Sequence, residues 1–277
     1  AEQGAVMTNL LELVGRKLHR AAEMVNLLTN YAADGETRKT LLHVYASLSH
    51  RERYDDEVKL NLRMRGQVFP FFMRISDIFI IGEILHEQQY RLETDLPDAP
   101  VVVDLGANIG ISTLWFLALR PNARIHAFEP AADNLAFLEK NFAGLENITL
   151  QKMAVGDVTG SATLHHGEFG GMHSLLIDGD GETVPLVSLA DYMAQQNIEH
   201  IDLLKLDIEG SELDAMKGLG PRIKDVRAII GEVHEAIVDE DAFYAFLKDN
   251  GFKVLWKRFF QESREQQVHG FEAVRAV

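Results

Sequence analysis

The sequence predicts an α/β protein built on an open, mostly parallel sheet, with a helical segment in front of it. From Val101 onward, β-rich runs alternate with helical runs, which is typical of parallel strands joined by crossover helices. Two more β-rich runs, FKVLWKRFF and VHGFEAVRAV, end the sequence with no helix between them, so this last pair is expected to be antiparallel. The 277 residues, 47% of them hydrophobic, suffice for one large domain and an accessory piece.

The first part of the chain is expected to be helical. Residues 1–65 should form an N-terminal helical subdomain and residues 66–277 the sheet domain. In the first helix, packing of an apolar stripe against the subdomain's own core is the favoured interpretation, and homodimerisation through the N-terminal helices is the alternative. The stripe recurs at steps of three and four, at Leu11, Val14, Leu18, Ala21, Val25 and Leu28.

The remaining elements follow from the pattern of apolar runs. A connecting segment should hold a strand or hairpin at GQVFPFFMR and a helix at SDIFIIGEILHEQQY that ends near Tyr90. Strands are expected at residues 101–105, 124–128, 148–154, 201–207 and 228–233. Helices are expected at residues 111–119, 133–142, 189–196, 211–218 and 241–250.

Composition disfavours nucleic acid and membrane as partners. The formal net charge of −15 would repel phosphate backbones and anionic lipid. Without cysteine, the sequence has no disulfide, thiolate nucleophile or cysteine-based zinc site. No apolar run approaches the roughly 18 residues of a spanning helix, and the N-terminus lacks the order of charges of a signal peptide. We expect a cytoplasmic protein.

The stretch VVVDLGANIGIST joins a strand to a helix through Gly106 and Gly110. These glycines allow a tight turn with room for a ligand, and the helix directs its positive end into that space. At the three glycine positions of a dinucleotide fingerprint the sequence has Gly106, Asn108 and Ile111, which weakens a nicotinamide-dependent oxidoreductase as an alternative. Asp104, at the strand's end, would repel a pyrophosphate and attract a cationic amine.

Glu129 ends the next predicted strand, within HAFEP. An acid at this place can accept hydrogen bonds from the two hydroxyls of a ribose. A ligand that carries both a ribose and an α-amino group is S-adenosylmethionine. The two motifs together therefore predict this cofactor, with S-adenosylhomocysteine as its product. The plain alternative is an α/β domain whose glycines only turn the chain.

Five stretches, in this order and spacing, resemble the FkbM family of S-adenosylmethionine-dependent O-methyltransferases. They are DLGANIGISTLWF, HAFEPAADNLAFLEKNF, AVGDVTG, DLLKLDIEGSELDAMKG and IIGEVHE, and KLDIEGSE is the most family-specific part. The resemblance covers residues 76–251, approximately. It implies a Rossmann-like class I methyltransferase sheet and methyl transfer to a hydroxyl of a small metabolite, a sugar or polyketide-type natural product of secondary metabolism. It also implies the cofactor contacts, which are Asp77, Tyr90, Asp104, Gly106, Ala107, Asn108, Gly110, Glu129, Pro130, Asn134, Met153, Ala154 and Asp207.

Methyl transfer to a hydroxyl requires a group that takes the proton. His234, Lys205 and Asp207 lie at the carboxyl ends of the fourth and fifth predicted strands, where open α/β sheets bind ligands. They are the candidate catalytic residues. His234 is the candidate base, because an imidazole titrates near neutral pH.

Candidate substrate contacts lie at the same edge and in a glycine-rich insertion. Glu209 and Glu232 belong to the edge, although the acids of EGSE could instead cap the next helix, with Glu212 binding free backbone N–H groups. The insertion between residues 156 and 185 is expected to be a strand pair with a connection that covers the acceptor. Its MHSL stretch resembles the family, which makes His173 and Ser174 candidate substrate contacts.

Two alternatives stay open at this edge. Asp207, Glu232 and His234 are ligand types for a divalent metal that would lower the pKa of the substrate hydroxyl, but no spacing is diagnostic, so no metal is predicted. The other alternative is a non-catalytic scaffold or sensor that binds S-adenosylmethionine without turnover. The identity of the acceptor lies in loops that carry no transferable code.

Overall fold

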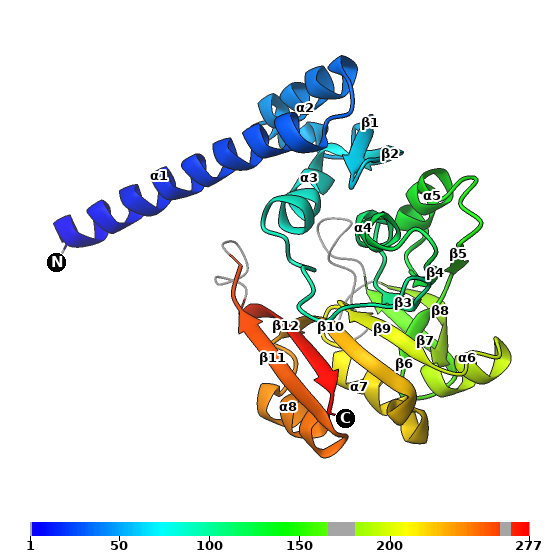
Figure 1. Ribbon diagram of the computed structural model, residues 1–277. Coiled ribbons are helices and arrows are strands. Elements are labelled where there is room, and N and C mark those ends of the chain that lie inside the picture. Colours follow the sequence, from blue (N-terminus) through cyan, green and yellow to red (C-terminus); the bar gives the residue numbers. More distant parts are fainter. Residues whose placement is uncertain (1, 166–180, 261–266, 277) are drawn as a thin grey trace. The chain divides into compact units, whose positions relative to one another are not determined.

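A computed structural model of the chain describes residues 2–165, 181–260 and 267–276, with side chains from residue 14 onward within them. Contacts between residues divide the chain into two compact units, Ala1–Glu87 and Gln88–Val277. Figure 1 labels their helices and strands. This division comes later in the chain than the domain boundary expected between residues 65 and 66. Among the described helices, none combines the length and the apolar character needed to cross a membrane.

Helices open the first unit. The second of them begins after Asp34, whose side chain accepts a hydrogen bond from the backbone N–H of Thr37 at 2.7 Å and so caps the helix. The helical elements are α1 (Glu2–Asn26), a π-helical turn (Leu27–Tyr31), α2 (Gly35–Ser47) and a 3-10 turn (Arg51–Arg53).

A β-hairpin follows these helices. Its strands β1 (Glu57–Met64) and β2 (Gln67–Arg74) pair antiparallel. Arg65 and Gly66 between them have φ angles of 47° and 85°, as a two-residue type I′ turn requires. The strand expected at GQVFPFFMR is thereby confirmed. Its partner β1 lies in the stretch that the sequence assigned to helices. That prediction was wrong because the alternation of apolar and charged residues in β1 is short and can also be interpreted as helical.

The first unit ends in a broken helix. A 3-10 turn (Ile75–Asp77), α3 (Ile78–Ile81) and a π-helical turn (Gly82–His86) replace the single helix that the sequence predicts. The helix also stops before Tyr90, where it was expected to end. Gln88 has a φ of 54°, and a residue in this left-handed conformation terminates a helix.

The second unit is built on a seven-stranded sheet in the order β11-β12-β10-β9-β3-β4-β5. All neighbours from β10 to β5 are parallel, and β12 is antiparallel to both β10 and β11. The predicted fold class and the terminal hairpin are therefore confirmed. The strands are β3 (Val101–Leu105), β4 (Arg124–Phe128), β5 (Ile148–Gln151), β9 (Ile201–Leu206), β10 (Val226–His234), β11 (Phe252–Arg258) and β12 (Val268–Arg275).

The order of the strands determines where a ligand can bind. From β3 the chain runs through β4 to β5 on one side of the sheet and later returns to β9 and β10 on the other side. The carboxyl ends of β3 and β9 therefore flank a topological switch point, where open α/β sheets form a ligand-binding crevice. Each predicted site residue at the end of β3, β4, β9 or β10 lies along this edge.

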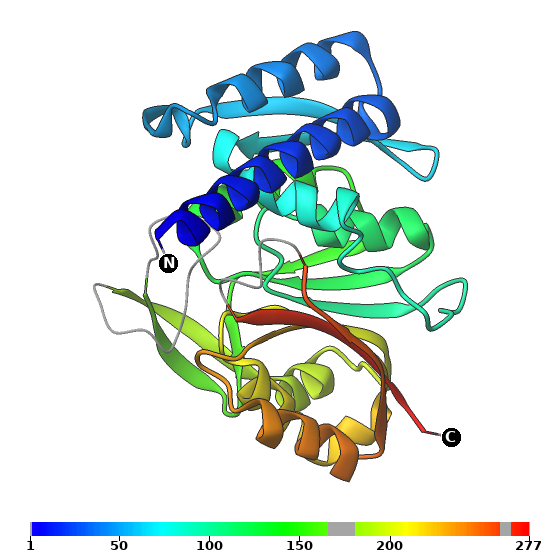
Figure 2. The ribbon, with the colours of Figure 1, turned by 90° about the vertical axis from the view of Figure 1, so that its left-hand side faces the viewer.

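Helices cover the sheet close to where the sequence predicts them. Side chains of α6, α7 and α8 share one apolar core with strands β3, β9, β10 and β12. In Figure 2 the orange helix α8 runs below the red strand β12. Helix α4 is almost entirely buried, which agrees with its lack of charged residues. The helices are α4 (Ile111–Leu119), α5 (Ala132–Asn141), α6 (Leu189–Gln195), α7 (Glu212–Lys217) and α8 (Glu240–Asp249).

A second, three-stranded sheet lies beside α7. Strands β6 (Ala154–Gly156), β7 (Gly160–His165) and β8 (Gly181–Ser188) form it in the order β6-β8-β7, and β7 and β8 are antiparallel. The strand pair expected in the insertion is thereby confirmed. The single strand expected over residues 148–154 is wrong, because the chain leaves the main sheet after Gln151 and starts β6 at Ala154. His173 and Ser174 lie outside the described residues.

Candidate active site

The glycine loop after β3 is held against the ends of β4 and β9. The backbone N–H groups of Gly106 and Ala107 both donate to the carbonyl oxygen of Phe128, at 3.1 and 2.9 Å. Gly106 has a φ of +77°, and a Cβ there would lie 1.9 Å from the carbonyl oxygen of Asp207. The close approach of the chain at the end of β9 therefore leaves no room for a side chain at this position.

Glu129 links the glycine loop to the start of α5. One carboxylate oxygen accepts from the backbone N–H of Asn108 at 2.9 Å, and the other accepts from that of Ala131 at 3.0 Å. The carboxylate is buried. The side-chain oxygen of Asn108 is also buried and has no hydrogen-bond partner in the part of the chain that the structure describes. A buried acceptor in this state suits a ligand that brings a donor.

A pocket opens at the end of β4, between this strand and the second sheet; Phe128 and Pro130 line it, and Glu129 between them in the chain does not. It holds about 340 Å³ of empty space, counting the part open to solvent. Four of the predicted cofactor contacts line it, together with apolar side chains from the ends of β4 and β9. The predicted contacts are Gly106, Pro130, Met153 and Ala154.

Asp104, expected to meet an amine, is enclosed by its own chain. One carboxylate oxygen accepts from the hydroxyls of Ser112 and Thr113 at 2.8 and 2.6 Å, and the other lies 3.1 Å from the ammonium of Lys205. The side chain is fully buried. Because Asp104 does not reach the surface of the crevice, the direct contact that the sequence allowed is unsupported.

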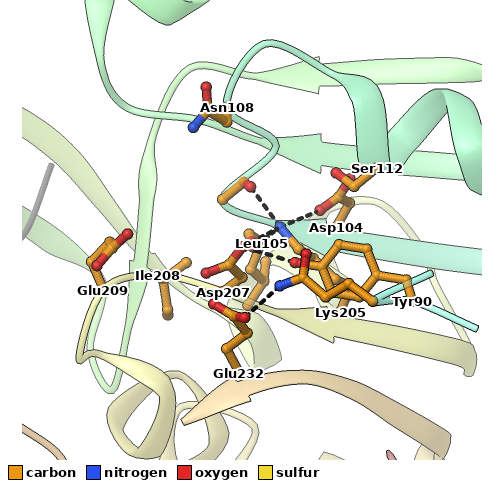
Figure 3. Close-up of polar contacts among 12 residues, drawn as sticks. Tyr90, Asp104, Leu105, Asn108, Ser112, Lys205, Asp207, Ile208, Glu209 and Glu232 are labelled. Carbon is orange, nitrogen blue, oxygen red and sulfur yellow. Dashed lines mark hydrogen bonds and ion pairs between the residues drawn. The ribbon is translucent and has the colours of Figure 1, made fainter. Parts of the chain in front are cut away.

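The ammonium of Lys205 contacts two backbone carbonyl oxygens and two carboxylates (Figure 3). Its ammonium donates to the carbonyl oxygens of Gly106 and Leu105, at 2.6 and 3.1 Å, and lies 3.6 Å from the carboxylate of Asp207. Burial lowers the pKa of Lys205, but the charges of Asp104 and Asp207 outweigh burial and raise it above its ordinary value. A charged ammonium has no lone pair, so Lys205 holds groups in place and does not take a proton.

Asp207 and Glu232 are the acids at the surface of the crevice. The hydroxyl of Tyr90 donates to Asp207 at 2.8 Å, and the amide of Gln89 donates to Glu232 in a short hydrogen bond (Figure 3). Burial, with the charge of Asp207, raises the pKa of Glu232 to about 8. Burial and the same charge also raise the pKa of Tyr90 well above its ordinary value, which keeps the phenol a donor.

His234 lies between two carboxylates. Its Nδ1 is 2.9 Å from Glu212 and its Nε2 is 3.2 Å from Glu209. Burial lowers the pKa of His234, but these two hydrogen bonds raise it well above 6.5. Both ring nitrogens thus contact carboxylates, and this arrangement favours the charged imidazolium.

Glu212 organises the loop that carries Glu209. The fully buried carboxylate of Glu212 accepts from the backbone N–H groups of Ile208 and Gly210, at 3.3 and 3.1 Å, as well as from His234. Helix α7 begins at Glu212 without a side-chain cap from Ser211, and Glu212 binds N–H groups of the preceding loop, so the capping role considered for EGSE is not seen. Glu209 and Gly210 have φ angles of 52° and 105°, so two consecutive left-handed residues turn the chain here.

The candidate metal ligands come together at this edge, each with a protein partner. One ligand atom from each of Asp207, Glu232 and His234 lies within 4.8 Å of the others. However, Asp207 is bound by Tyr90, Glu232 by Gln89, and both nitrogens of His234 by glutamates. The donor set is therefore engaged by protein groups in this structure.

Two more predicted cofactor residues are Asp77 and Asn134. Asp77 belongs to the first unit, where its buried carboxylate accepts from the backbone N–H of Arg74 at 2.7 Å and from the guanidinium at 3.0 Å. Asn134 is buried in the first turn of α5 and does not line the pocket. The sequence analysis did not identify Gln89 as a partner of Glu232, and no sequence pattern indicates it. It also did not identify Ser112 as a partner of Asp104, although the position of Ser112 in the first helical turn after the glycine loop could have indicated this.

The chain was compared with known proteins. A family model described as the methyltransferase FkbM domain matches residues 104–254. The methyltransferase sdnD of Sordaria araneosa is 29% identical over 65% of this chain and 84% of its own length. The 31-O-demethyl-FK506 methyltransferase FkbM of Streptomyces tacrolimicus is 30% identical over 64% of this chain and 82% of its own. The 2-O-methyltransferase NoeI of Sinorhizobium fredii is 28% identical over 53% and 68%.

A solved structure of a methyltransferase FkbM from Methylobacillus flagellatus covers 90% of this chain and 58% of its own, with 18% identity and a TM-score of 0.48. The family assignment does not depend on that distant likeness, because the family model spans the sheet from the end of β3 to β11. Within that span lie the glycine loop, Glu129 and the edge that carries Asp207 and His234. With these residues on one methyltransferase sheet, and more than half of its length matched, the chain belongs to the FkbM methyltransferase family.

Proposed function

We propose that the protein transfers the methyl group of S-adenosylmethionine to a hydroxyl of a small metabolite and releases S-adenosylhomocysteine. The observation that carries this proposal is the buried carboxylate of Glu129, which is fixed against the glycine loop, while its chain neighbours Phe128 and Pro130 line an apolar pocket at the end of β4. An acid there suits a ribose, and an apolar pocket next to it suits a flat base.

The residues present fit this cofactor. Glu129 would hold the ribose, and Met153 and Ala154 would flank the adenine in the pocket. The buried oxygen of Asn108 offers an unused acceptor in the same loop. Asp207 would face the methionine amine, because Asp104 is enclosed. When bound, the cofactor supplies an electrophilic methyl group.

The acceptor's proton is assigned to His234. Glu212, which is fully buried, fixes a proton on Nδ1, as the acid of a catalytic triad does for its histidine. Nε2 faces Glu209, whose side chain is 31% exposed at the crevice. Once Glu209 turns to the acceptor, the pKa of His234 falls because one carboxylate partner is gone. The imidazolium then releases its Nε2 proton to solvent, and the free Nε2 can accept the proton of the acceptor's hydroxyl.

The class of acceptor is inferred from relatives and charge. Proteins similar to this chain carry the names 31-O-demethyl-FK506 methyltransferase, 2-O-methyltransferase and hexuronic acid methyltransferase. These names support a hydroxyl on a sugar or on a polyketide-type natural product as the acceptor. The net charge of −15 opposes a nucleic acid as substrate.

Thermal unfolding with added ligand tests the cofactor. A ligand that binds only the folded protein raises its melting temperature, so S-adenosylmethionine and S-adenosylhomocysteine should both raise it, and NADH should not. Glu129→Gln should abolish the shift, whereas Glu146→Gln, at an exposed acid, should keep it. Stabilisation by NADH alone would support an oxidoreductase instead.

Methyl transfer itself is tested with S-adenosylmethionine that carries a labelled methyl group and a panel of hydroxylated sugars and polyketide-type metabolites. Label in an ether-linked methyl product is expected, and His234→Gln should lower its rate without weakening cofactor binding. Binding without transfer to any member of a broad panel would favour the non-catalytic scaffold.

A further inference from the structure

Helix α1 turns its polar side toward its own unit. The carboxylate of Glu23 is buried and accepts from the hydroxyl of Tyr45 at 2.5 Å and from the guanidinium of Arg20 at 2.9 Å. His19 lies 3.1 Å from the carboxylate of Glu87. These ionic and polar contacts fix one side of the helix, so the other side faces away from them.

The apolar side of α1 is exposed. Val14, Leu18 and Val25 have exposed fractions of 45%, 66% and 55%, and Ala21 between them is exposed as well. The interpretation that the stripe packs against its own core is therefore wrong for these residues. A soluble helix normally buries its apolar side and exposes its charges, so this reversed arrangement indicates that something outside the unit covers the stripe.

The spacing of the stripe indicates what covers it. Steps of four, three and four from Val14 to Val25 place these residues at alternating a and d positions of a heptad, and Met7 and Leu11 continue the spacing toward the N-terminus of the sequence. Apolar residues at the a and d positions form the seam of a coiled coil. The partner of such a seam is another helix with the same repeat.

We propose that the exposed seam of α1 is a homodimer interface, covered by α1 of a second copy in a parallel, in-register pair. The seam is compatible with itself. Its flanking e positions hold Gly15 and Ala22, and its flanking g positions hold Lys17 and Met24. In a parallel pair each g residue faces an e residue five positions on, so Lys17 meets Ala22 of the partner subunit and no like charges meet.

Other occupants fit less well. Anionic lipid and nucleic acid are opposed by the net charge of −15. The seam from Met7 to Val25 is about 27 Å long at the rise of an α-helix, so the buried area is small. We expect a weak dimer that dissociates on dilution.

Sedimentation equilibrium of the full chain over a range of concentrations tests the dimer. The expected mass approaches twice 31.1 kDa at high concentration and falls on dilution. Leu18→Glu should raise the dissociation constant about tenfold or more, since it places two like charges in the seam. Leu42→Glu is the matched control, because Leu42 on α2 is 50% exposed and outside the seam; it should leave the dissociation constant unchanged.

The lack of cysteine allows a second test of the same geometry. In a parallel pair the two d positions face each other, so Ala21→Cys should form a disulfide-linked dimer under mild oxidation, and Ala46→Cys on α2 should not. Equal cross-linking of both variants would overturn the proposal. A chain that stays monomeric at every concentration, with Leu18→Glu lowering its melting temperature, would overturn it too, because the chain would then cover its own seam. None of these readouts depends on the cofactor or acceptor.

Discussion

Two cations at the carboxyl edge of the sheet are each held by two carboxylates, but in different surroundings. Lys205 lies between Asp104 and Asp207 and also binds backbone carbonyls of β3, so strands β3 and β9 enclose it. His234 lies between Glu212 and Glu209, and Glu209 belongs to a loop with left-handed residues. The first arrangement joins two strands, whereas the second joins a strand to the loop before α7. In each, one carboxylate is fully buried and the other, Asp207 or Glu209, is partly exposed. The same charge pattern therefore links different elements in the two places.

The largest expected effect is on the enclosed cation. Lys205→Met leaves the carboxylate of Asp104 buried without its counter-charge, and we expect a loss of about 3–5 kcal/mol in the free energy of unfolding. Denaturant unfolding measures it. Lys217→Met, at an exposed ion pair with Asp214, is the control and should change the free energy by less than about 0.5 kcal/mol. A loss below about 1 kcal/mol for Lys205→Met would remove the basis of the comparison.

Gly106 tests how closely the two strands approach. Gly106→Ala meets the carbonyl oxygen of Asp207 in addition to an unfavourable φ of +77°. Gly144→Ala is a matched control, because Gly144 has a φ of +78° and nothing within 4 Å of an added Cβ. We expect about 1–2 kcal/mol of lost stability for the control, from backbone strain alone, and about 1–3 kcal/mol more for Gly106→Ala, from the clash. Equal losses would show that the approach of β9 does not require glycine.

The two glutamates around His234 should respond unequally. Glu212→Gln removes the charge of a fully buried acceptor, and we expect a loss of about 1–3 kcal/mol in unfolding free energy. Glu209→Gln changes a partly exposed pair and should cost less than about 1 kcal/mol. Chemical denaturation of both variants measures the difference. If Glu209→Gln destabilises the fold more, Glu209 and not Glu212 anchors the loop.

The smallest effect concerns pH. Burial raises the pKa of Glu232 from 4.5 to about 8 in the folded protein. The folded chain therefore binds more protons than the unfolded chain in this window, and stability falls as the pH rises through it. Glu232→Gln cannot titrate, so the unfolding free energy of this variant should depend less on pH between 4.5 and about 8. An unchanged slope would show that Glu232 is not the titrating group.

Elements with an unambiguous pattern could be predicted from the sequence. Strand β3 and helix α4 lie where they were expected, since a run of apolar residues followed by glycine admits few alternatives. The strand predicted over residues 148–154 divides into two because Ala154 joins a second sheet, and one sequence does not show which sheet a short strand joins. Strand β1 was missed for a related reason, because it is a strand only through its pairing with β2, which its own sequence does not show.

The residues that lie at the site could be predicted, but their protonation and their burial could not. The edge that holds Asp207, Glu232 and His234 follows from where strands end. The protonation of His234 depends on Glu212 and Glu209, which approach it only when the loop after β9 turns back. Likewise, Asp104 ends a strand as predicted, yet Ser112 and Thr113 enclose it. Spacing along the chain carries no information about such enclosure.

Isothermal titration calorimetry with S-adenosylhomocysteine tests the central claim most directly, with the wild-type chain, Glu129→Gln and Glu146→Gln measured side by side. We predict one site of micromolar affinity in the wild-type chain and in Glu146→Gln, and no measurable binding in Glu129→Gln. Absence of binding to the folded wild-type chain would contradict the cofactor assignment. Undiminished binding to Glu129→Gln would contradict the role of the carboxylate at the end of β4.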